Sequence, residues 1–294
     1  MLDKAFLFAG MNELKGILSH NGELINAETF CLHPANRAFK YGDGIFDTLK
    51  VESGRVWFAE DHYFRLMSSM RMLRMKIPMQ LTLDHYESQV LATAVANKLE
   101  NAARIRVNVF RKEGGFYAPR SQEVDMLIEA VPLPPAYPGP YEIELFKDFN
   151  VLSGLLSTVK TNNRLVNVLA GIFARENSYQ NSVLLNEKKE VVEASNANIF
   201  LVRGQEVLTP SLESGCINGI VRKKLLEGLN AQDRWEVVEA RVSPFDLLKA
   251  DEVFLTNSIQ EIQPVHSYRK KTYETHRTVE LARLWENGIK KRFS

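Results

Sequence analysis

The spacing of apolar residues along the chain predicts a mixture of strands and helices. In the first part of the chain, short apolar runs bounded by turn sequences at residues 20–22 and 52–55 predict strands. An apolar stripe at helical spacing, which includes Leu66, Met70 and Leu73, predicts a helix from about residue 60 that ends before Pro78. Strands are expected at residues 6–8, 16–18, 44–51, 56–58, 104–110 and 124–130, and a second helix at residues 82–98.

The pattern after residue 140 mixes the same two kinds of element. Strands are predicted at residues 143–146, 182–185, 199–202 and 253–255, and helices at residues 163–175, 219–229 and 244–248. Both halves therefore combine strands with helices, and the second half is richer in strands. We predict an α+β fold.

The length and one proline-rich stretch predict two domains. A chain of 294 residues exceeds the usual size of a single core. Five prolines fall between residues 131 and 140, where they exclude a helix or a central strand and stiffen the chain. We expect a smaller N-terminal domain at residues 1–131, a linker at residues 132–140 and a larger C-terminal domain at residues 141–294.

Composition and charge exclude several classes of protein. The 37 basic and 36 acidic side chains balance to a net charge of +1, without the basic block of a nucleic-acid-binding protein. No apolar run approaches the ~20 residues that span a bilayer, and residues 1–8 do not have the shape of a signal peptide. The two cysteines and the scattered histidines show no ligand spacing, so we expect no metal site. A cytoplasmic protein is expected, with a small-molecule substrate and neither nucleic acid nor membrane as a partner.

One lysine in the middle of the chain is a candidate for carbonyl chemistry. Lys160 follows a largely apolar and β-branched run at residues 155–159 and precedes a predicted helix. At the end of a buried run, a lysine can lie at the floor of a pocket, where partial burial and a helix N-terminus favour its neutral amine. The alternative is a lysine that extends into solvent from the end of a strand.

Two further segments could bind a cofactor that has a ring nitrogen and an anionic group. Glu193 opens a loop of small and amide residues before a strand, and a carboxylate can keep a ring nitrogen protonated. Residues 214–224 run through glycine into a helix that Asn218 could cap, so backbone N–H groups near Gly219 could bind an anion. The alternatives are a surface turn and an ordinary capped helix. Residues 256–258 could add hydroxyl and backbone donors, and Arg65 a positive charge.

These segments together resemble the class-IV aminotransferase family, the fold-type IV pyridoxal 5′-phosphate enzymes. The resemblance runs in order through residues 36–46, 62–66, 160, 193–200, 219–222 and 256–258. It implies a two-domain fold with the cofactor in the interdomain cleft, and a homodimer. It also implies that Lys160 forms the Schiff base and transfers the proton, that Glu193 pairs with the pyridine nitrogen, and that the remaining cofactor contacts come from Arg65, Asn198, Gly219, Ile220, Val221, Asn257 and Ser258.

Within this family the motifs are most similar to those of aminodeoxychorismate lyase. The sequence Lys-x-x-Asn-Arg-Leu at residues 160–165 and the position of Thr48 carry this resemblance. It implies elimination of pyruvate from 4-amino-4-deoxychorismate to give 4-aminobenzoate, with Thr48 beside the reacting carbon. The expected substrate-binding residues are Phe46, Tyr117 and an arginine, for which Arg111 and Arg106 are candidates, with Arg104 as a further one.

Two alternatives to the lyase remain open. A branched-chain or D-amino acid transaminase would use the same lysine to transfer the proton. A catalytically inactive protein on the same fold is a further possibility, because a fold does not dictate a function. The presence of Lys160, Glu193 and Arg65 together argues against an inactive protein.

Overall fold

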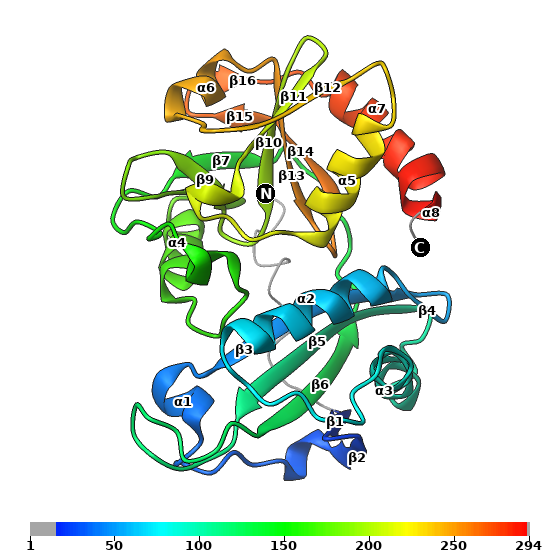
Figure 1. The fold of residues 1–294 in the computed structure, drawn as a ribbon. Helices are drawn as coiled ribbons and strands as arrows, with labels where there is room; N and C mark the ends of the chain where they lie inside the picture. Colours follow the sequence, from blue (N-terminus) through cyan, green and yellow to red (C-terminus); the bar gives the residue numbers. More distant parts are fainter. Residues whose placement is uncertain (1–15, 293–294) are drawn as a thin grey trace. The chain divides into compact units, whose positions relative to one another are not determined.

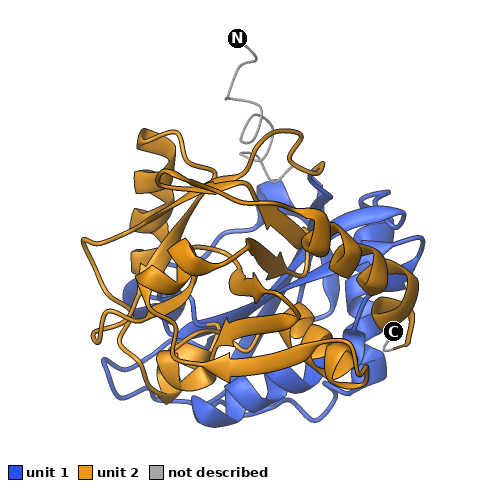
Figure 2. Cartoon of the chain, turned by 90° about the horizontal axis from the view of Figure 1, so that it is seen from above, with its two compact units in different colours: residues 1–134, 161–163 blue, residues 135–160, 164–294 orange. Residues whose placement is uncertain are grey.

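The chain forms two compact units. The computed structural model describes residues 16–292. The described residues up to Pro134, together with Thr161–Asn163, form unit 1, and the described residues of Pro135–Lys160 and those from Arg164 onward form unit 2 (Figure 2). The division falls within the proline-rich stretch. Unit 1 also includes Thr161–Asn163, which the sequence analysis assigned to the C-terminal domain.

Unit 1 is a six-stranded sheet with two long helices. The strand order is β2-β1-β6-β5-β3-β4 (Figure 1). The strands are β1 (Ile17–His20), β2 (Glu23–Asn26), β3 (Gly44–Glu52), β4 (Arg55–Val56), β5 (Ala102–Arg111) and β6 (Val124–Pro132). The helices are η2 (Ala27–Thr29), α1 (Arg37–Tyr41), α2 (Ala59–Met72) and α3 (Leu83–Ala96).

Alternation along the central strands gives the sheet of unit 1 two different faces. Leu49 on β3, Ile105 on β5 and Ile128 on β6 are fully buried on the face that α2 and α3 cover. Their sequence neighbours point to the opposite face, because successive side chains of a strand alternate. Polar side chains occupy much of that opposite face, among them Thr48 and Arg106.

Asp47 is a buried charge in the helix-covered core of unit 1. It is 1% exposed, and its carboxylate pairs with Arg65 and with Nδ1 of His62 at 3.1 Å, both from α2. Burial alone would raise the pKa of Asp47, but Arg65 and His62 outweigh it and hold the pKa well below its ordinary value. This cluster fixes α2 on the sheet.

Unit 2 is built on two five-stranded sheets, in the orders β12-β11-β10-β13-β14 and β16-β15-β7-β8-β9. The strands are β7 (Glu142–Leu145), β8 (Asn181–Leu185), β9 (Val191–Ala194), β10 (Asn198–Arg203), β11 (Glu206–Pro210), β12 (Glu236–Ala240), β13 (Glu252–Asn257), β14 (Glu261–Val265), β15 (Ser267–Tyr268) and β16 (Lys271–Thr272). The helices are η3 (Leu155–Thr158), α4 (Leu165–Glu176), η4 (Leu212–Ser214), α5 (Ile220–Asn230), α6 (Pro244–Lys249), α7 (His276–Leu284), η5 (Trp285–Ile289), which is a π-helix, and α8 (Lys290–Arg292).

A continuous apolar core joins both sheets of unit 2. It includes fully buried residues from the two sheets, such as Ile143 and Val183 from one and Ile199 and Val253 from the other. Helix α4 packs on β8 through a separate cluster around Ala170, and α5 packs against β12 and β13. The core thus holds β9, β10 and β13 in place, and the candidate site lies at the ends of these strands.

The structure confirms the α+β composition and corrects several local expectations. The predicted strand at 56–58 stops at Val56, because Phe58 takes a left-handed conformation (φ +55°) and starts α2. The run before Lys160 is the short helix η3, in which Leu155 and Leu156 are exposed, so the lysine does not end a buried run. The strand predicted at residues 6–8 lies outside the described residues.

Between residues 16 and 292, no helix is both long and apolar enough to cross a membrane. The same part of the chain contains no group of three or more potential metal-ligand side chains.

The Asp47 cluster predicts how unit 1 responds to acid. Because the folded-state pKa of Asp47 lies below 3.8, its contribution is fully present above that pH and is lost as the pH falls through the folded-state pKa. We expect Asp47→Asn to lower the free energy of unfolding by about 3–5 kcal/mol at pH 7, because Arg65 loses its counter-charge and His62 loses the carboxylate that it contacts. Urea unfolding at several pH values should show this gap narrowing below pH 3.8. The exposed Asp84→Asn is the control, and a gap that stays constant with pH would contradict the prediction.

Candidate functional site

The first part of the candidate site is a buried carboxyl group near two cationic side chains in unit 2. Glu193, at the end of β9, is 5% exposed and accepts a hydrogen bond from the backbone N–H of Ile217 at 2.9 Å. Burial raises the pKa of Glu193, while Arg164, the Ile217 N–H and Lys160 each act to lower it. Lys160 is half-buried. The structure therefore brings Lys160 and Glu193 together, with the carboxyl group held in an environment that makes its ionisation costly.

Arg164 is a member of this group that the sequence analysis did not assign. Its guanidinium donates to the carbonyl of Val159 at 2.5 Å, beside Lys160. Burial lowers the pKa of Arg164, and Glu193 opposes that effect. The only sequence signal was its place four residues after Lys160, which does not reveal the carboxyl group that it faces.

The second part of the site is the N-terminus of α5. The helix begins at Ile220 with Gly219 as its N-cap, and no side chain caps it. The first backbone N–H groups of the helix, including those of Ile220 and Val221, therefore lack a side-chain acceptor. Asn218, which we expected to be the cap, stands one residue too early, so that expectation was wrong.

Asn198 and Gly219 fit each other closely at this helix end. The Nδ2 of Asn198 donates to the carbonyl of Ile217 at 2.8 Å, and the residue is 5% exposed. A Cβ at position 219 would lie 2.1 Å from the Asn198 Oδ1. Only glycine lets the backbone come this close to the amide.

The end of β13 adds hydroxyl and amide groups. Thr256 pairs with Asn198 across the β10–β13 ladder, and its buried Oγ1 has no hydrogen-bond partner. Asn257 accepts from the backbone N–H groups of Ile259 and Gln260 at 2.9 and 2.8 Å, which folds the turn that contains Ser258. From the sequence, residues 256–258 were candidates only as a group, and the unpaired hydroxyl of Thr256 is visible only in the structure.

Unit 1 carries a separate group of candidate residues on the face of its sheet opposite α2 and α3. Thr48 on β3 lies opposite Arg106 on β5, and the guanidinium of Arg106 stacks over the Phe46 ring at 3.8 Å. Lys50, Arg104, Asn108 and Glu129 lie on the same face by register. Burial lowers the pKa of Arg106, opposed by Glu129 and strengthened by Arg104, so these charges are partly removed from water.

The residues that follow Lys160 are held against the start of β3. Thr161 forms a bridge with Ile45, and the N–H of Asn162 donates to the carbonyl of Gly44 at 2.9 Å. A Cβ at Gly44 would lie 2.6 Å from the Asn162 Nδ2, so this close approach also requires glycine. The segment therefore has a fixed position on the strand that carries Phe46 and Thr48.

Arg65 is oriented by the core of unit 1. Its Nε donates to Asp47 at 3.1 Å, a second nitrogen contacts the same carboxylate, and 16% of the side chain is exposed. The bidentate geometry fixes the plane of the guanidinium.

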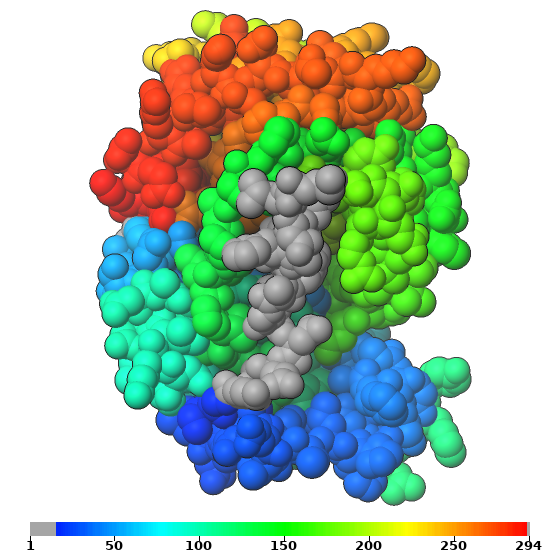
Figure 3. Space-filling view, turned by 180° about the vertical axis from the view of Figure 1, so that it is seen from behind, coloured from blue at the N-terminus to red at the C-terminus, as the bar shows by residue number. Residues whose placement is uncertain are grey.

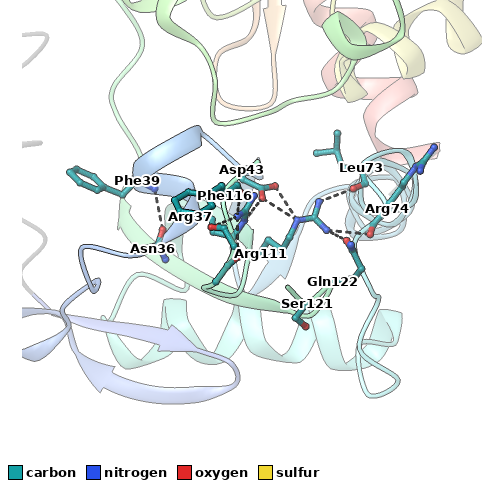
Figure 4. A network of polar contacts seen from close by, with 12 residues as sticks. Asn36, Arg37, Phe39, Asp43, Leu73, Arg74, Arg111, Phe116, Ser121 and Gln122 are labelled. Carbon is teal, nitrogen blue, oxygen red and sulfur yellow. Dashed lines mark hydrogen bonds and ion pairs between the residues drawn. The ribbon is translucent and has the colours of Figure 1, made fainter. Parts of the chain in front are cut away.

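Arg111, in contrast, forms hydrogen bonds and an ion pair with other residues of unit 1. Figure 4 shows its guanidinium surrounded by Asp43, the carbonyls of Leu73 and Arg74, and the side chain of Gln122. The residue is 6% exposed. An arginine with these partners holds protein segments together, so the structure favours Arg106 over Arg111 as an arginine open to a substrate.

Tyr117 lies in the loop between β5 and β6, which projects from the body of unit 1 (Figure 3). Phe116 and Tyr117 at its tip are 84% and 90% exposed. The base of the loop is fixed by Arg37, which pairs with Asp43 and donates to the carbonyls of Gly114, Gly115 and Phe116 (Figure 4). The loop thus has an anchored base and an exposed aromatic tip.

Comparison with known proteins assigns the chain to a family. The family model described as "Amino-transferase class IV" matches residues 44–268. The chain is 31% identical to the "Putative branched-chain-amino-acid aminotransferase" of Methanocaldococcus jannaschii, with 83% of this chain and 85% of that protein covered. It is 30% identical to the "Aminodeoxychorismate lyase" of Vibrio harveyi, with 78% and 84% covered. The chain belongs to the class-IV aminotransferase family, and it is an enzyme of that family.

Solved structures confirm the predicted fold. The branched-chain aminotransferase of Thermoproteus uzoniensis superposes with a TM-score of 0.86 at 22% identity, covering 94% of this chain and 95% of that chain. The branched-chain amino acid aminotransferase of Thermobaculum terrenum, solved in its "PLP-form (holo-form)", gives 0.82 at 21% identity, covering 95% and 96%. The fold is that of the fold-type IV enzymes, as the sequence motifs predicted.

The fit between Gly219 and Asn198 predicts the effect of one added methyl group. We expect Gly219→Ala to lower the free energy of unfolding by about 1–3 kcal/mol. The added methyl group would displace the buried Asn198 amide, which donates to the Ile217 carbonyl. The matched control is Gly171→Ala in α4, where an added Cβ meets nothing within 4 Å; this change should stabilise by about 0.5–1 kcal/mol. Denaturant unfolding of both variants, of Asn198→Ser and of the double variant Gly219→Ala/Asn198→Ser tests this. If Gly219→Ala costs as much in the Asn198→Ser background as in the wild-type protein, the steric explanation is wrong.

Proposed function

We propose that the protein is a pyridoxal 5′-phosphate-dependent 4-amino-4-deoxychorismate lyase, which releases pyruvate and forms 4-aminobenzoate. The proposal combines three supports. The family is established, unit 2 offers side chains and backbone N–H groups that could hold the cofactor, and the polar sheet face of unit 1 suits a substrate with two carboxylates.

The residues of the site fit the cofactor of the family. A phosphate group needs backbone N–H donors and hydroxyl groups, which the uncapped N-terminus of α5, the unpaired Oγ1 of Thr256 and the turn at Ser258 offer. The glycine at position 219 lets the backbone approach such a group closely. Arg65, with its guanidinium oriented by Asp47, is the proposed charged partner of the phosphate. Asn198 and Asn257 shape the cradle through their backbone contacts.

The chain's own groups supply the proton transfers. When bound, the cofactor provides an aldehyde for Lys160 and a ring that withdraws electrons from the reacting carbon. Glu193, whose burial favours its protonated form, would hold a proton at the ring nitrogen. The Nζ of Lys160 is then the base that accepts the proton of the substrate ring. The bond between the neighbouring ring carbon and the enolpyruvyl oxygen then breaks, so that enolpyruvate leaves with the electron pair and the ring becomes aromatic. Protonation of the enolate at its CH₂ carbon gives pyruvate.

The observation that carries the proposal is the pairing of Thr48 with Arg106 across β3 and β5, next to a second arginine, Arg104, on the same face. Lys50, Arg104 and Arg106 lie on this face by register, together with the acidic residues Glu52, Asp125 and Glu129, and Glu52 pairs with Lys50 at 3.4 Å. The two arginines remain as the cations available to a substrate. Carboxylates bind arginine through charge-assisted hydrogen bonds, and aminodeoxychorismate carries two of them. A branched aliphatic side chain would instead need an apolar lining. Thr48 is proposed to lie beside the reacting carbon, and Phe46 and Tyr117 to bound the substrate.

A transaminase is the second candidate. Its support is the 31% sequence identity to a relative named as a branched-chain aminotransferase. The identity to the relative named as a lyase is nearly the same, at 30%. It would use Lys160 and Glu193 in the same way, and Arg106 would bind the carboxylate of an amino acid. The two functions therefore differ in the product, which an assay can identify.

The assay compares the two reactions on one preparation of the protein. We expect pyruvate release from 4-amino-4-deoxychorismate, and no keto-acid formation from leucine or D-alanine with 2-oxoglutarate. Lys160→Ala should reduce the activity by roughly 10²–10⁴-fold or more, since the proton acceptor is lost. Transamination without pyruvate release would exclude the lyase. A protein that takes up no cofactor would exclude both functions.

Two arginine variants refine this test. Arg106→Met should raise KM roughly 10- to 100-fold, because a charge-assisted contact of ~1.5–3 kcal/mol is lost, and unfolding should change little. Arg111→Met should instead lower the stability of the protein, because Asp43 loses a buried partner. If Arg111→Met instead raised KM without lowering the stability, and Arg106→Met lowered the stability, Arg111 would be the substrate-binding arginine.

A homodimer is proposed from an exposed apolar surface on unit 2. Leu165, Val168 and Ile172 lie along the outer side of α4, at 64%, 55% and 39% exposure, and Leu155 and Leu156 of η3 are also exposed. The opposite side of α4 already packs on β8. Exposed apolar residues in such numbers indicate an interface, and a second copy is the partner that the family resemblance implies.

Sedimentation velocity tests the dimer. The protein should sediment as a dimer at micromolar concentration, and Val168→Glu should shift it towards the monomer. Exposed Lys188→Glu is the control for added negative charge and should leave the dimer unchanged. A monomer at all concentrations would exclude this interface.

A further inference from the structure

The turn between β13 and β14 ends on a strained and buried acid. Glu261 pairs with Asn257 across the turn, is 7% exposed and has a φ of +59°. This left-handed conformation is normally taken by glycine, so a glutamate persists there only if other contacts hold it. Ser258 lies inside the same turn.

The contacts that hold Glu261 come from the end of the chain. The Nε1 of Trp285 donates to one carboxylate oxygen at 2.8 Å, and the Nζ of Lys290 donates to the other at 2.7 Å. Trp285 and Lys290 are only 1% and 3% exposed. The acid thus has a neutral donor on one oxygen and a buried cation on the other.

The π-helix explains how both donors reach one carboxylate. The π-helix η5 covers Trp285–Ile289, and the N–H of Lys290 donates to the carbonyl of Trp285, five residues earlier. This wider turn brings residues i and i+5 to the same side, where an α-helix would separate them. Single turns of π-helix often mark functional positions.

The same π-helix packs against α5. A Cβ at Gly228 of α5 would lie 2.6 Å from the side chain of Ile289. The C-terminal segment therefore contacts both elements of the phosphate cradle. It holds the Ser258 turn through Glu261, and it packs on the helix whose N-terminus begins at Ile220.

We propose that Trp285 and Lys290 are positioning residues for the cofactor phosphate, which act by fixing the Ser258 turn relative to α5. The inference rests on the proposed function, because it takes the phosphate to bind at these elements. Without Lys290, Glu261 is a buried carboxylate that lacks its cation and also faces Glu286, whose pKa its hydrogen bond with Glu261 raises to about 7. The turn then relaxes towards solvent, and the distance between its donors and the helix N-terminus is no longer set.

The test separates binding of the phosphate from binding of the rest of the cofactor. Apoenzyme is prepared from the full-length holoenzyme, and the dissociation constants of pyridoxal 5′-phosphate and of pyridoxal are measured by absorbance titration. We expect Lys290→Met to weaken binding of the phosphorylated form at least about tenfold and to change pyridoxal binding less than about twofold. Trp285→Phe, which removes one hydrogen bond and keeps an aromatic ring, should have a smaller effect in the same direction. The phosphorus NMR signal of the bound cofactor should shift in both variants.

Controls and contrary outcomes distinguish this inference from the proposed function. Arg283→Met removes an exposed cation from the preceding helix and should leave both dissociation constants unchanged. Glu261→Gln combined with Lys290→Met removes both charges and should restore part of the lost affinity. Equal weakening for both ligands, or no weakening in a Lys290→Met protein that remains folded, overturns the positioning role. If Lys290→Met does not fold, Trp285→Phe provides the test. Its dissociation constants for pyridoxal 5′-phosphate and for pyridoxal are then each compared with those of the wild-type protein. A wild-type protein that binds neither ligand overturns the proposed function itself.

Discussion

The constraint on which the candidate site depends is the burial of the Glu193 carboxyl group. It lies at the end of a strand, with the Ile217 N–H on one oxygen and the charges of Arg164 and Lys160 nearby. Burial of an acid is costly unless partners compensate it, so the positions of these partners are not independent. The Ile217 contact also fixes the segment that leads into α5. A single acid therefore links the lysine to the N-terminus of the helix.

In unit 1, side chains alternate along each strand, so the buried charge cluster lies on one face of the sheet and the candidate substrate-binding residues lie on the other. Asp47 points into the core, where it orients Arg65, and its neighbour Thr48 points to the other face, opposite Arg106. A shift of register by one residue would exchange these roles and place charges in the core. The Asp47 cluster therefore maintains stability and at the same time sets which side chains face the substrate in the proposed function.

Much of this arrangement could be read from the sequence, but the contacts that decide roles could not. Alternation predicted the central strands, and the ordered motifs predicted the family and its fold. The assignment of Lys160 to the end of a buried run was wrong, because the apolar residues Leu155 and Leu156 before it are exposed. Arg106 and Arg111 were both candidates in the sequence, and the partners of Arg111, which include Asp43 and the distant Leu73 and Gln122, distinguish the two arginines. The link between Glu261 and Lys290 joins segments 29 residues apart without a local pattern.

The attachment of the loop between β5 and β6 has a consequence for variation among related enzymes. Arg37 holds this loop through the carbonyl groups of Gly114, Gly115 and Phe116, and carbonyl groups are common to all amino acids. Its anchorage therefore places little demand on the identity of the side chain at position 116 or 117. Evolution, or a protein engineer, can exchange the aromatic pair at the tip without rebuilding the loop beneath it.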